Sequence, residues 1–324
     1  MVVKSEIGNI GGKIMRAFAL TLLALATGSF VSGCSFATST QSGAIQVLRT
    51  ARHQPLSTGT LVYACQGYPG TCLWYRHGSN VVAGMLNGIG FPVGMTVDNN
   101  GYVYVADQDA RSVLIYAKGT STAIKTLTDP KSGSPDDVAV AADGTVYVAE
   151  EQGYISVYAG GSTTPTSYLT DPNFVFDVQS VAVDEHHLVA ALYDDSNFQV
   201  DVDEFVGGKG NGVKVISTGL SGGSVRFDSA DNLVISLDTG SGEIEVYNGK
   251  TFALCNTILQ PGLPGYIGID RSNGDLYIPD GQDKVVHEET FGDCTGGGTI
   301  ERNYTAGLMA DGVISTAVDP GPGP

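Results

Sequence analysis

A block of about 43 residues recurs along the chain, and it constrains the fold more than any other feature of the sequence. The clearest copy runs from Phe91 to Gly119 and reads FPVGMTVDNNGYVYVADQDARSVLIYAKG. Val97 ends its first apolar run, and the corresponding residues follow at intervals of 43, 43, 44, 42 and 49: Val140, Val183, Phe227, Ile269 and Val318. A fixed period between 20 and 50 residues indicates a repeat architecture, in which each unit packs on its neighbours.

Each copy contains short runs of β-branched and aromatic residues bounded by Gly, Asp and Asn, which predict strands. The second run recurs at 103–106, 146–149, 188–191, 233–236 and 276–279, and the third at 113–116, 155–158, 200–205, 244–247 and 284–287. Four short strands in each unit predict the blade of a β-propeller.

The two ends of the repeat region complement each other. The last copy stops after Ile314–Val318, and the strands that it lacks are found near the other end, at Leu61–Ala64 and Leu73–Tyr75. One blade shared between the ends would remove two free sheet edges. The sequence therefore predicts an all-β protein, a six-bladed β-propeller with four-stranded antiparallel blades, whose closing blade is shared between N- and C-terminal strands. A Gly-rich insert at 296–298 explains the longer last interval.

The stretch Pro92–Asp107, PVGMTVDNNGYVYVAD, resembles the NHL repeat and the related six-bladed propellers of the gluconolactonase and regucalcin type. The unit Pro135–Glu150 is similar, whereas the units that begin at Asp177, Ser221 and Leu263 depart more from the pattern. The resemblance covers Thr58 to Pro324 and implies the fold. It does not select a function, because propellers support many unrelated activities.

The segment before the repeats has the pattern of an export signal. Residues 1–33 contain a basic start with Lys13 and Arg16, then an apolar run too short for a membrane span. The tetrad Val31-Ser32-Gly33-Cys34 resembles a bacterial lipobox, which implies lipidation of Cys34; the alternative is an ordinary signal peptide followed by an unrelated cysteine. The start codon is Met1 or Met15. We expect a signal peptide at 1–33, a lipidated tether at 34–57 and the propeller at 58–324, in an exported lipoprotein of the bacterial cell envelope.

The formal net charge of −17 at pH 7 restricts the partners. Such a charge argues against nucleic acid and against electrostatic docking on anionic lipid. We therefore expect a monomer that contacts the membrane through its lipid anchor only, and whose partner is an envelope protein or a glycan.

The five cysteines divide into Cys34 and four others, an even number in an oxidising compartment. Three pairings are possible. We favour Cys65 with Cys72, which flank a short loop, and Cys255 with Cys294, which fall late in successive units. The alternative is four free buried thiols.

Acidic residues gather in the loops that are expected on one face of the propeller. A ring of carboxylates there would suit a hard cation such as Ca²⁺, the candidate cofactor; its candidate ligands are Asp107, Asp136, Asp137, Glu150, Asp238 and Asp280. The alternative is that the acids ending the second strands accept backbone N–H bonds in a repeated turn. The same face is expected to present Tyr68, Asp109, Asp177, Tyr193 and Asp194 to a ligand.

No catalytic motif is evident, so we expect a binding or interaction scaffold. The alternative is a Ca²⁺-dependent lactonase or hydrolase, or a lyase, of the gluconolactonase-like type. Its best match is Pro135-Asp136-Asp137, which has Asp136 where that family has Asn, and the next copies lack a clear second ligand. An exposed aromatic patch on the loop face would favour the scaffold, whereas a complete ligand set in the channel would favour the enzyme.

Overall fold

The computed structural model describes residues 59–319, except positions 69, 187–188, 238–241, 261, 293, 295 and 310–311. The predicted signal peptide, Cys34 and the tether lie outside the described residues. The described residues fall within one compact unit, Pro55–Pro324. They are almost entirely strand and turn, and the 3-10 segment η1 (Val206–Gly208) is the helical element found in them.

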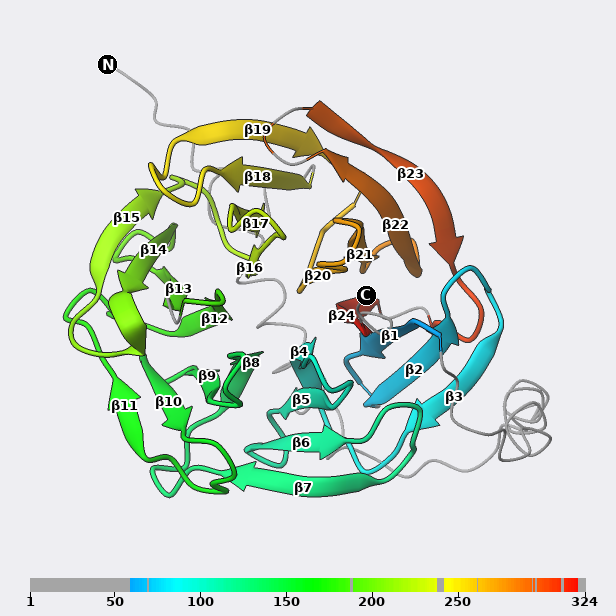
Figure 1. The fold of residues 1–324 in the computed structure, drawn as a ribbon, viewed down its shortest axis with the longest axis horizontal. Helices are drawn as coiled ribbons and strands as arrows, with labels where there is room; N and C mark the ends of the chain where they lie inside the picture. Colours follow the sequence, from blue (N-terminus) through cyan, green and yellow to red (C-terminus); the bar gives the residue numbers. More distant parts are fainter. Residues whose placement is uncertain are drawn as a thin grey trace, which may run out of the picture. The chain divides into compact units, whose positions relative to one another are not determined.

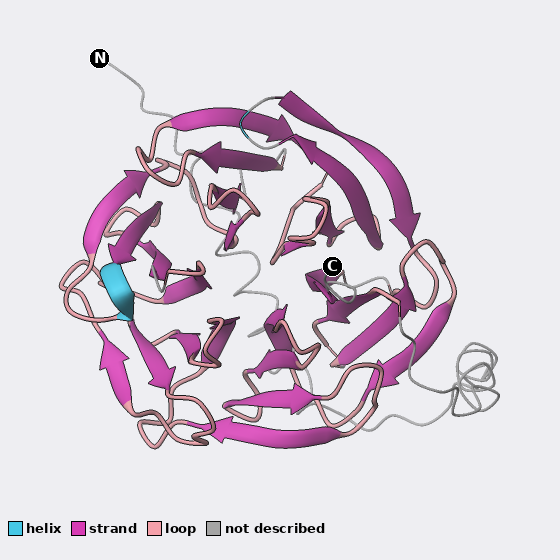
Figure 2. Ribbon diagram, in the orientation of Figure 1, coloured by secondary structure: helices cyan, strands magenta, loops and turns pink. Residues whose placement is uncertain are grey.

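Six four-stranded antiparallel sheets surround a common centre (Figures 1 and 2), which confirms the predicted six-bladed propeller. Blade 1 contains β4 (Pro92–Val97), β5 (Val103–Asp107), β6 (Ser112–Tyr116) and β7 (Ala123–Thr128). Blade 2 contains β8 (Pro135–Val140), β9 (Val146–Glu150), β10 (Tyr154–Tyr158) and β11 (Ser167–Leu169). Blade 3 contains β12 (Val178–Val183), β13 (Val189–Asp194), β14 (Val200–Phe205) and β15 (Val213–Ser217).

Blade 4 contains β16 (Val225–Phe227), β17 (Leu233–Leu237), β18 (Glu243–Tyr247) and β19 (Leu254–Leu259). Blade 5 contains β20 (Gly268–Ile269), β21 (Leu276–Asp280), β22 (Val285–Gly292) and β23 (Gly296–Tyr304). In each blade the first strand lies nearest the centre and the fourth at the rim (Figure 1).

The closing blade joins the two ends of the repeat region, as predicted. Its inner strand is β24 (Val313–Asp319), followed outward by β1 (Leu61–Gln66), β2 (Thr71–Arg76) and β3 (Val82–Leu86). Strands β1 and β24 are antiparallel, with Leu61 opposite Asp319. The ring is therefore closed by backbone hydrogen bonds between distant parts of the chain.

Strands β5 and β9 are buried along their whole length, because both faces of an inner sheet are covered by neighbouring blades. Tyr104 and Ile115 of blade 1, for example, pack against Val138 and Val148 of blade 2. The core is thus a set of apolar layers between blades. This explains why the strands read as continuous apolar runs rather than as alternating ones.

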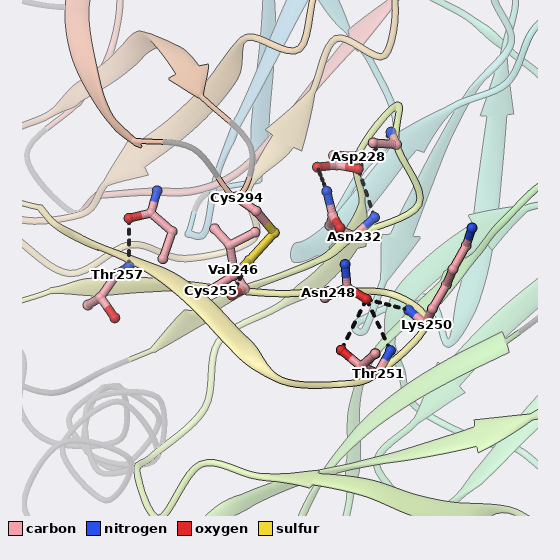
Figure 3. Close-up of a disulfide and its surroundings, with 11 residues drawn as sticks. Asp228, Asn232, Val246, Asn248, Lys250, Thr251, Cys255, Thr257 and Cys294 are labelled. Carbon is pink, nitrogen blue, oxygen red and sulfur yellow. Dashed lines mark hydrogen bonds between the residues drawn. A yellow bond between two sulfur atoms is a disulfide. The ribbon is translucent and has the colours of Figure 1, made fainter.

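The aspartate that ends the first strand of most copies holds the turn that follows it. Asp98 Oδ1 accepts hydrogen bonds from the backbone N–H groups of Asn100, at 2.9 Å, and Tyr102, at 2.8 Å. Asp228 does the same for Ala230 and Asn232, both at 2.8 Å (Figure 3). Aspartate favours such turns because its short side chain reaches the backbone two residues on. The aspartate that recurs after the first strand therefore stabilises a turn and does not mark a binding site.

Two disulfides are present, and both have the favoured pairing. Cys65 and Cys72 lie directly opposite each other on β1 and β2. Cys255 of β19 is bonded to Cys294, which lies between β22 and β23, so this bond joins blades 4 and 5 at the rim (Figure 3). It closes a separation of 39 residues. In the chain-entropy model a loop of that length stabilises the fold by about 4 kcal/mol.

The Gly-rich insert at 296–298 lengthens two strands instead of forming a loop. The predicted third strand of blade 5 at 284–287 extends in the structure to Gly292, and β23 begins at Gly296. Glycine has low strand propensity, so strand structure at this insert is not expected from its composition. The long β22–β23 hairpin brings Cys294 to the neighbouring blade.

Candidate functional site

Because successive strands of a blade alternate in direction, the turns between second and third strands share one face with the connections between blades. We call this the loop face. On this face the turns between second and third strands contact the connections between blades. The N–H of Gln108 donates to the carbonyl of Phe91 at 2.9 Å, and the N–H of Glu151 donates to the carbonyl of Ser134 at 2.9 Å. Most of the predicted site residues lie on or just below this face.

The centre of the ring is crossed by a side chain that the sequence did not point to. Arg226 of β16 forms a bidentate ion pair with Asp137 of β8: its two terminal nitrogens lie 2.6 and 3.1 Å from the carboxylate oxygens. The guanidinium also donates to the carbonyls of Ile267, at 3.0 Å, and Met95, at 3.4 Å. Arg226 of blade 4 therefore binds groups of blades 1, 2 and 5.

Asp137 is fully buried and its bonding capacity is used by the protein. Besides the guanidinium, its Oδ2 accepts a hydrogen bond from Ser180 Oγ of β12 at 2.5 Å. A Cβ on Gly94 would lie 2.1 Å from Asp137 Oδ1, so the glycine permits the inner strands to approach this closely. Charge-assisted bidentate bonds are among the strongest hydrogen bonds in proteins. A cation at Asp137 would have to displace the guanidinium.

Three carboxylates of the predicted acidic face interact electrostatically with Tyr266, which lies in the connection between blades 4 and 5. The Tyr266 hydroxyl donates to the Gln179 carbonyl at 3.3 Å. Burial raises the pKa of Tyr266 well above its ordinary value, and the negative charges of Asp136, Asp137 and Asp177 add to this effect. Tyr266 therefore stays neutral in the physiological range. Asp136 in turn accepts a hydrogen bond from Gln108 Nε2.

The acids that end the second strands are placed differently: each binds a loop of its own blade. Asp107 accepts backbone N–H bonds from Gly90 and Phe91, both at 2.9 Å, in the connection that enters blade 1. Asp280 Oδ1 accepts from the N–H groups of Gln282, at 2.8 Å, and Asp283, at 3.2 Å. Asp107 and Asp280 thus make the backbone N–H bonds that were expected if these acids stabilise turns instead of binding a cation. Asp238, the corresponding residue of blade 4, lies outside the described residues.

Glu150 occupies the equivalent position in blade 2, but its surroundings are polar and buried. Its Oε1 accepts a hydrogen bond from Ser156 Oγ at 2.9 Å, and its Oε2 has no hydrogen-bond partner. Burial raises the pKa of Glu150 to about 8, and the negative charges of Asp129 and Glu151 contribute. Asp129, which is not among the predicted site residues, accepts hydrogen bonds from the hydroxyls of Tyr154, at 2.7 Å, and Tyr168, at 2.8 Å.

Of the residues predicted to contact a ligand on the loop face, some are exposed and others are buried. Tyr68 is 71% exposed and Asp109 is also exposed, whereas Asp177 and Asp194 are buried. Tyr193 requires correction: it is fully buried, its ring packs on Phe174 with 5.0 Å between centroids, and its hydroxyl donates to Asp203 at 3.0 Å. Strand β13 extends to Asp194, three residues past the end of the run predicted at 188–191, so Tyr193 belongs to the strand and its side chain is buried.

Two phenylalanines form the exposed aromatic surface of this region. Phe176, in the connection to blade 3, stacks on Phe198 of the β13–β14 turn, with ring centroids 4.9 Å apart and planes inclined by 17°. Phe176 is 38% exposed, Phe198 is 36% exposed, and Val175 beside them is 55% exposed. We call these three residues the aromatic patch. It adjoins Asp177, so an apolar surface lies next to the acidic centre of the loop face.

Fold and site together define a six-bladed β-propeller in which an Arg226–Asp137 ion pair joins inner strands of blades 2 and 4. No protein-family model and no curated protein matches the chain. Solved structures that are similar to it include hydrazine synthase of Kuenenia stuttgartiensis, with a TM-score of 0.53 and 16% identity over 68% of this chain and 70% of that one. A chain of a nidogen/laminin complex has a TM-score of 0.58 and 15% identity, over 80% of this chain and 98% of that one. At these identities the similarity concerns the fold alone.

Among the described residues, no helix is long and apolar enough to span a membrane.

Proposed function

We propose that the chain is a lipid-anchored propeller of the bacterial cell envelope, which binds a protein or glycan partner through its loop face. The aromatic patch is the observation that supports this function best. Exposed apolar surface costs free energy in water, and a stacked pair of rings is preorganised to receive a flat apolar group. The similar chains come from an assembly of nidogen with laminin and from an enzyme, hydrazine synthase, so the fold itself is compatible with either class.

The surroundings of the patch indicate the chemistry of the partner. The chain carries a net charge of −17, and Asp136 and Asp177 lie at the acidic centre next to the patch. Electrostatic complementarity selects partners and speeds their encounter. The partner should therefore combine a flat apolar group, such as a sugar ring or an aromatic side chain, with positive charge around it.

The metal-dependent hydrolase is less well supported, because Asp137, the best candidate ligand of that alternative, already binds Arg226 through both oxygens. An arginine in that position neutralises the carboxylate on which the proposed cation would depend. The scaffold function requires no such rearrangement.

Replacement of both phenylalanines, Phe176→Ala with Phe198→Ala, should weaken partner binding. Aromatic residues at the centre of an interface often contribute 2 kcal/mol or more, so we expect the Kd to rise at least about tenfold. Photo-crosslinking in cells, followed by mass spectrometry and by titration of the captured partner in purified form, measures this change.

Tyr102→Ala is the matched control, because Tyr102 is 39% exposed but lies on the β4–β5 turn, on the opposite face. A partner that binds the double alanine variant as tightly as the parent protein would refute the role of the patch.

Replacement of Cys34 by serine should release the protein from the membrane. Acylation of a lipobox cysteine supplies enough buried hydrocarbon for stable anchoring, and the serine hydroxyl is no substrate for it. Fractionation of cells that express the parent or the Cys34→Ser protein tests this, with the Cys65–Cys72 hairpin left intact. Membrane association of the serine variant would show that export does not end in a lipid anchor.

A further inference from the structure

Two buried side chains of blade 5 face each other without a hydrogen bond. Asp280 ends β21 and is 1% exposed; His287 lies in β22 and is 7% exposed. Asp280 Oδ2 and His287 Nε2 are 3.8 Å apart, and neither atom has a hydrogen-bond partner. The N–H···O distance of a hydrogen bond is about 2.7–3.2 Å, so this pair is too far apart for a direct one.

The contact made by Nδ1 of His287 determines whether Nε2 carries a hydrogen or a lone pair. Nδ1 lies 2.7 Å from Asn303 Oδ1, an amide oxygen that only accepts. Nδ1 therefore carries the hydrogen, and in the neutral imidazole Nε2 presents its lone pair to the carboxylate. Two lone pairs that face each other away from water repel, so a positive charge between them would be strongly stabilised.

The carboxylate is held in this position from its other side. The backbone N–H groups of Gln282 and Asp283 bind Oδ1, as described above, and leave Oδ2 directed at the histidine. Gly262 packs on the same carboxylate: a Cβ at this glycine would lie 2.2 Å from Oδ2. The approach requires the absence of a side chain at 262, where φ is +87°.

The neighbouring groups on this face of the blade are also oxygen-rich. Ile278 pairs with His287 and packs between blades 4 and 5, so the histidine is on the face turned to blade 4. Glu289, two residues on, projects from the same face and accepts a hydrogen bond from Gln260 Nε2 at 2.6 Å. Gln260 Oε1 is buried and has no partner. The nearby cation Arg302 is bound to Glu288, which projects from the opposite face.

We propose that Asp280 and His287 bind a divalent transition-metal ion, for which Zn²⁺ is the best match. Zinc binds imidazole nitrogen at about 2.0–2.1 Å and carboxylate oxygen at about 2.0–2.2 Å, so a tetrahedral ion places the two atoms roughly 3.4 Å apart. The present separation of 3.8 Å is close to that value. A mixed nitrogen and oxygen set suits zinc better than Ca²⁺ or Mg²⁺, which prefer oxygen alone. The Asn303 bond to Nδ1 is the outer-shell support typical of metal-binding histidines.

The site differs from the Ca²⁺ ring expected from the sequence. Asp280 is among the ligands predicted for that ring, but the partner that the structure gives it is a histidine of the adjacent strand, within one blade. An ion here clamps β21 to β22 below the loop face, and water reaches its remaining positions from the side of Asn303, which is exposed.

Calorimetric titration of the EDTA-treated full-length protein with ZnCl₂ tests the proposal. The background should be His186→Ala, because Glu185, His186 and Asp231 place ligand atoms within 4.8 Å of one another at the surface and form a second candidate cluster. We expect one site, unaffected by excess Ca²⁺ or Mg²⁺. Loss of an outer-shell partner alone costs about 10- to 100-fold in metal affinity, so Asp280→Asn and His287→Gln should each weaken binding at least as much.

His77→Gln is the matched control, because His77 is an exposed histidine bound to Glu288 and should leave the affinity unchanged. A variant that gains a signal guards against loss of folding: His287→Cys should bind Co²⁺ with a new thiolate-to-metal absorption band. Absence of zinc binding in the His186→Ala protein, or binding that His287→Gln does not weaken, would overturn the proposal.

Discussion

Replacement of Arg226 by leucine is expected to destabilise the propeller by about 3–5 kcal/mol, the cost of removing one partner from a buried ion pair. The Asp137 carboxylate would be left without its cationic partner in a site with no exposed surface, and the carbonyls of Met95 and Ile267 would lose a donor. Chemical denaturation at neutral pH, monitored by circular dichroism, measures the change in the free energy of unfolding.

Two further variants show whether the unpaired charge is the cause. Adding Asp137→Asn to Arg226→Leu should recover most of the loss, because the amide carries no charge. Arg271→Leu removes an exposed arginine that lies 3.3 Å from Asp231, and pairs of this kind contribute less than about 1 kcal/mol. Equal losses for Arg226→Leu and Arg271→Leu would mean that the central pair adds nothing beyond a surface contact.

The Glu150→Gln variant is expected to be more stable than the parent protein at alkaline pH, by up to about 5 kcal/mol. Burial raises the pKa of Glu150 from its ordinary value of 4.5 to about 8, so the folded protein holds this proton more tightly than the unfolded chain does. Its contribution to stability is complete below about pH 4.5 and is lost as the pH rises toward 8; each pKa unit corresponds to about 1.4 kcal/mol. Glutamine has no proton to lose.

Urea unfolding between pH 5 and pH 9 tests this expectation. The two proteins should have similar stability at pH 5 and diverge as the pH increases. Glu185→Gln is the control, because the side chain of Glu185 is exposed and its charge does not contribute to the raised pKa of Glu150, so its replacement should leave this pH dependence nearly unchanged. Parallel curves for the parent and Glu150→Gln would show that Glu150 is ionised in the folded protein well below pH 8.

The fold was predictable because it depends on local patterns that the chain repeats. The run Val103–Ala106 is apolar, β-branched and bounded by turn residues in the sequence, and it forms β5 with one residue more. The closing blade was predictable for a related reason: a strand at 314–318 without its partners, and two strands near residue 61 without theirs, complete one sheet.

The centre of the ring was not predictable in this way, since it depends on contacts between blades. Arg226 stands in the sequence Val225-Arg226-Phe227, where alternation makes it an ordinary outward residue of a strand. In the innermost strand that direction leads to the ring centre, and its partner Asp137 is 89 positions away. The sequence feature that could have indicated the ion pair is a basic residue in an innermost strand together with acidic residues in the innermost strands of other blades.

Tyr193 and His287 illustrate two other limits. A shift in the predicted end of β13 was enough to place Tyr193 on the surface in the prediction and in the interior in the structure, because strand residues alternate between faces. His287 was not among the predicted site residues and stood only at the end of the strand predicted at 284–287. Only the register of β21 and β22, which no single repeat defines, pairs His287 with Ile278 and so places it on the same face as Asp280.

The closing blade, which combines strands from both ends of the repeat region, also affects how the molecule folds. Leu61 pairs with Asp319, so β1 cannot find its inner neighbour until β24 has been synthesised. Closing a loop of about 250 residues costs about 5 kcal/mol of chain entropy, only a few kcal/mol more than closing a short hairpin. The delay is therefore a matter of time more than of free energy. Until the last strand arrives, the growing chain is an open arc with an unpaired edge, which makes it a substrate for chaperones and for domain exchange between copies.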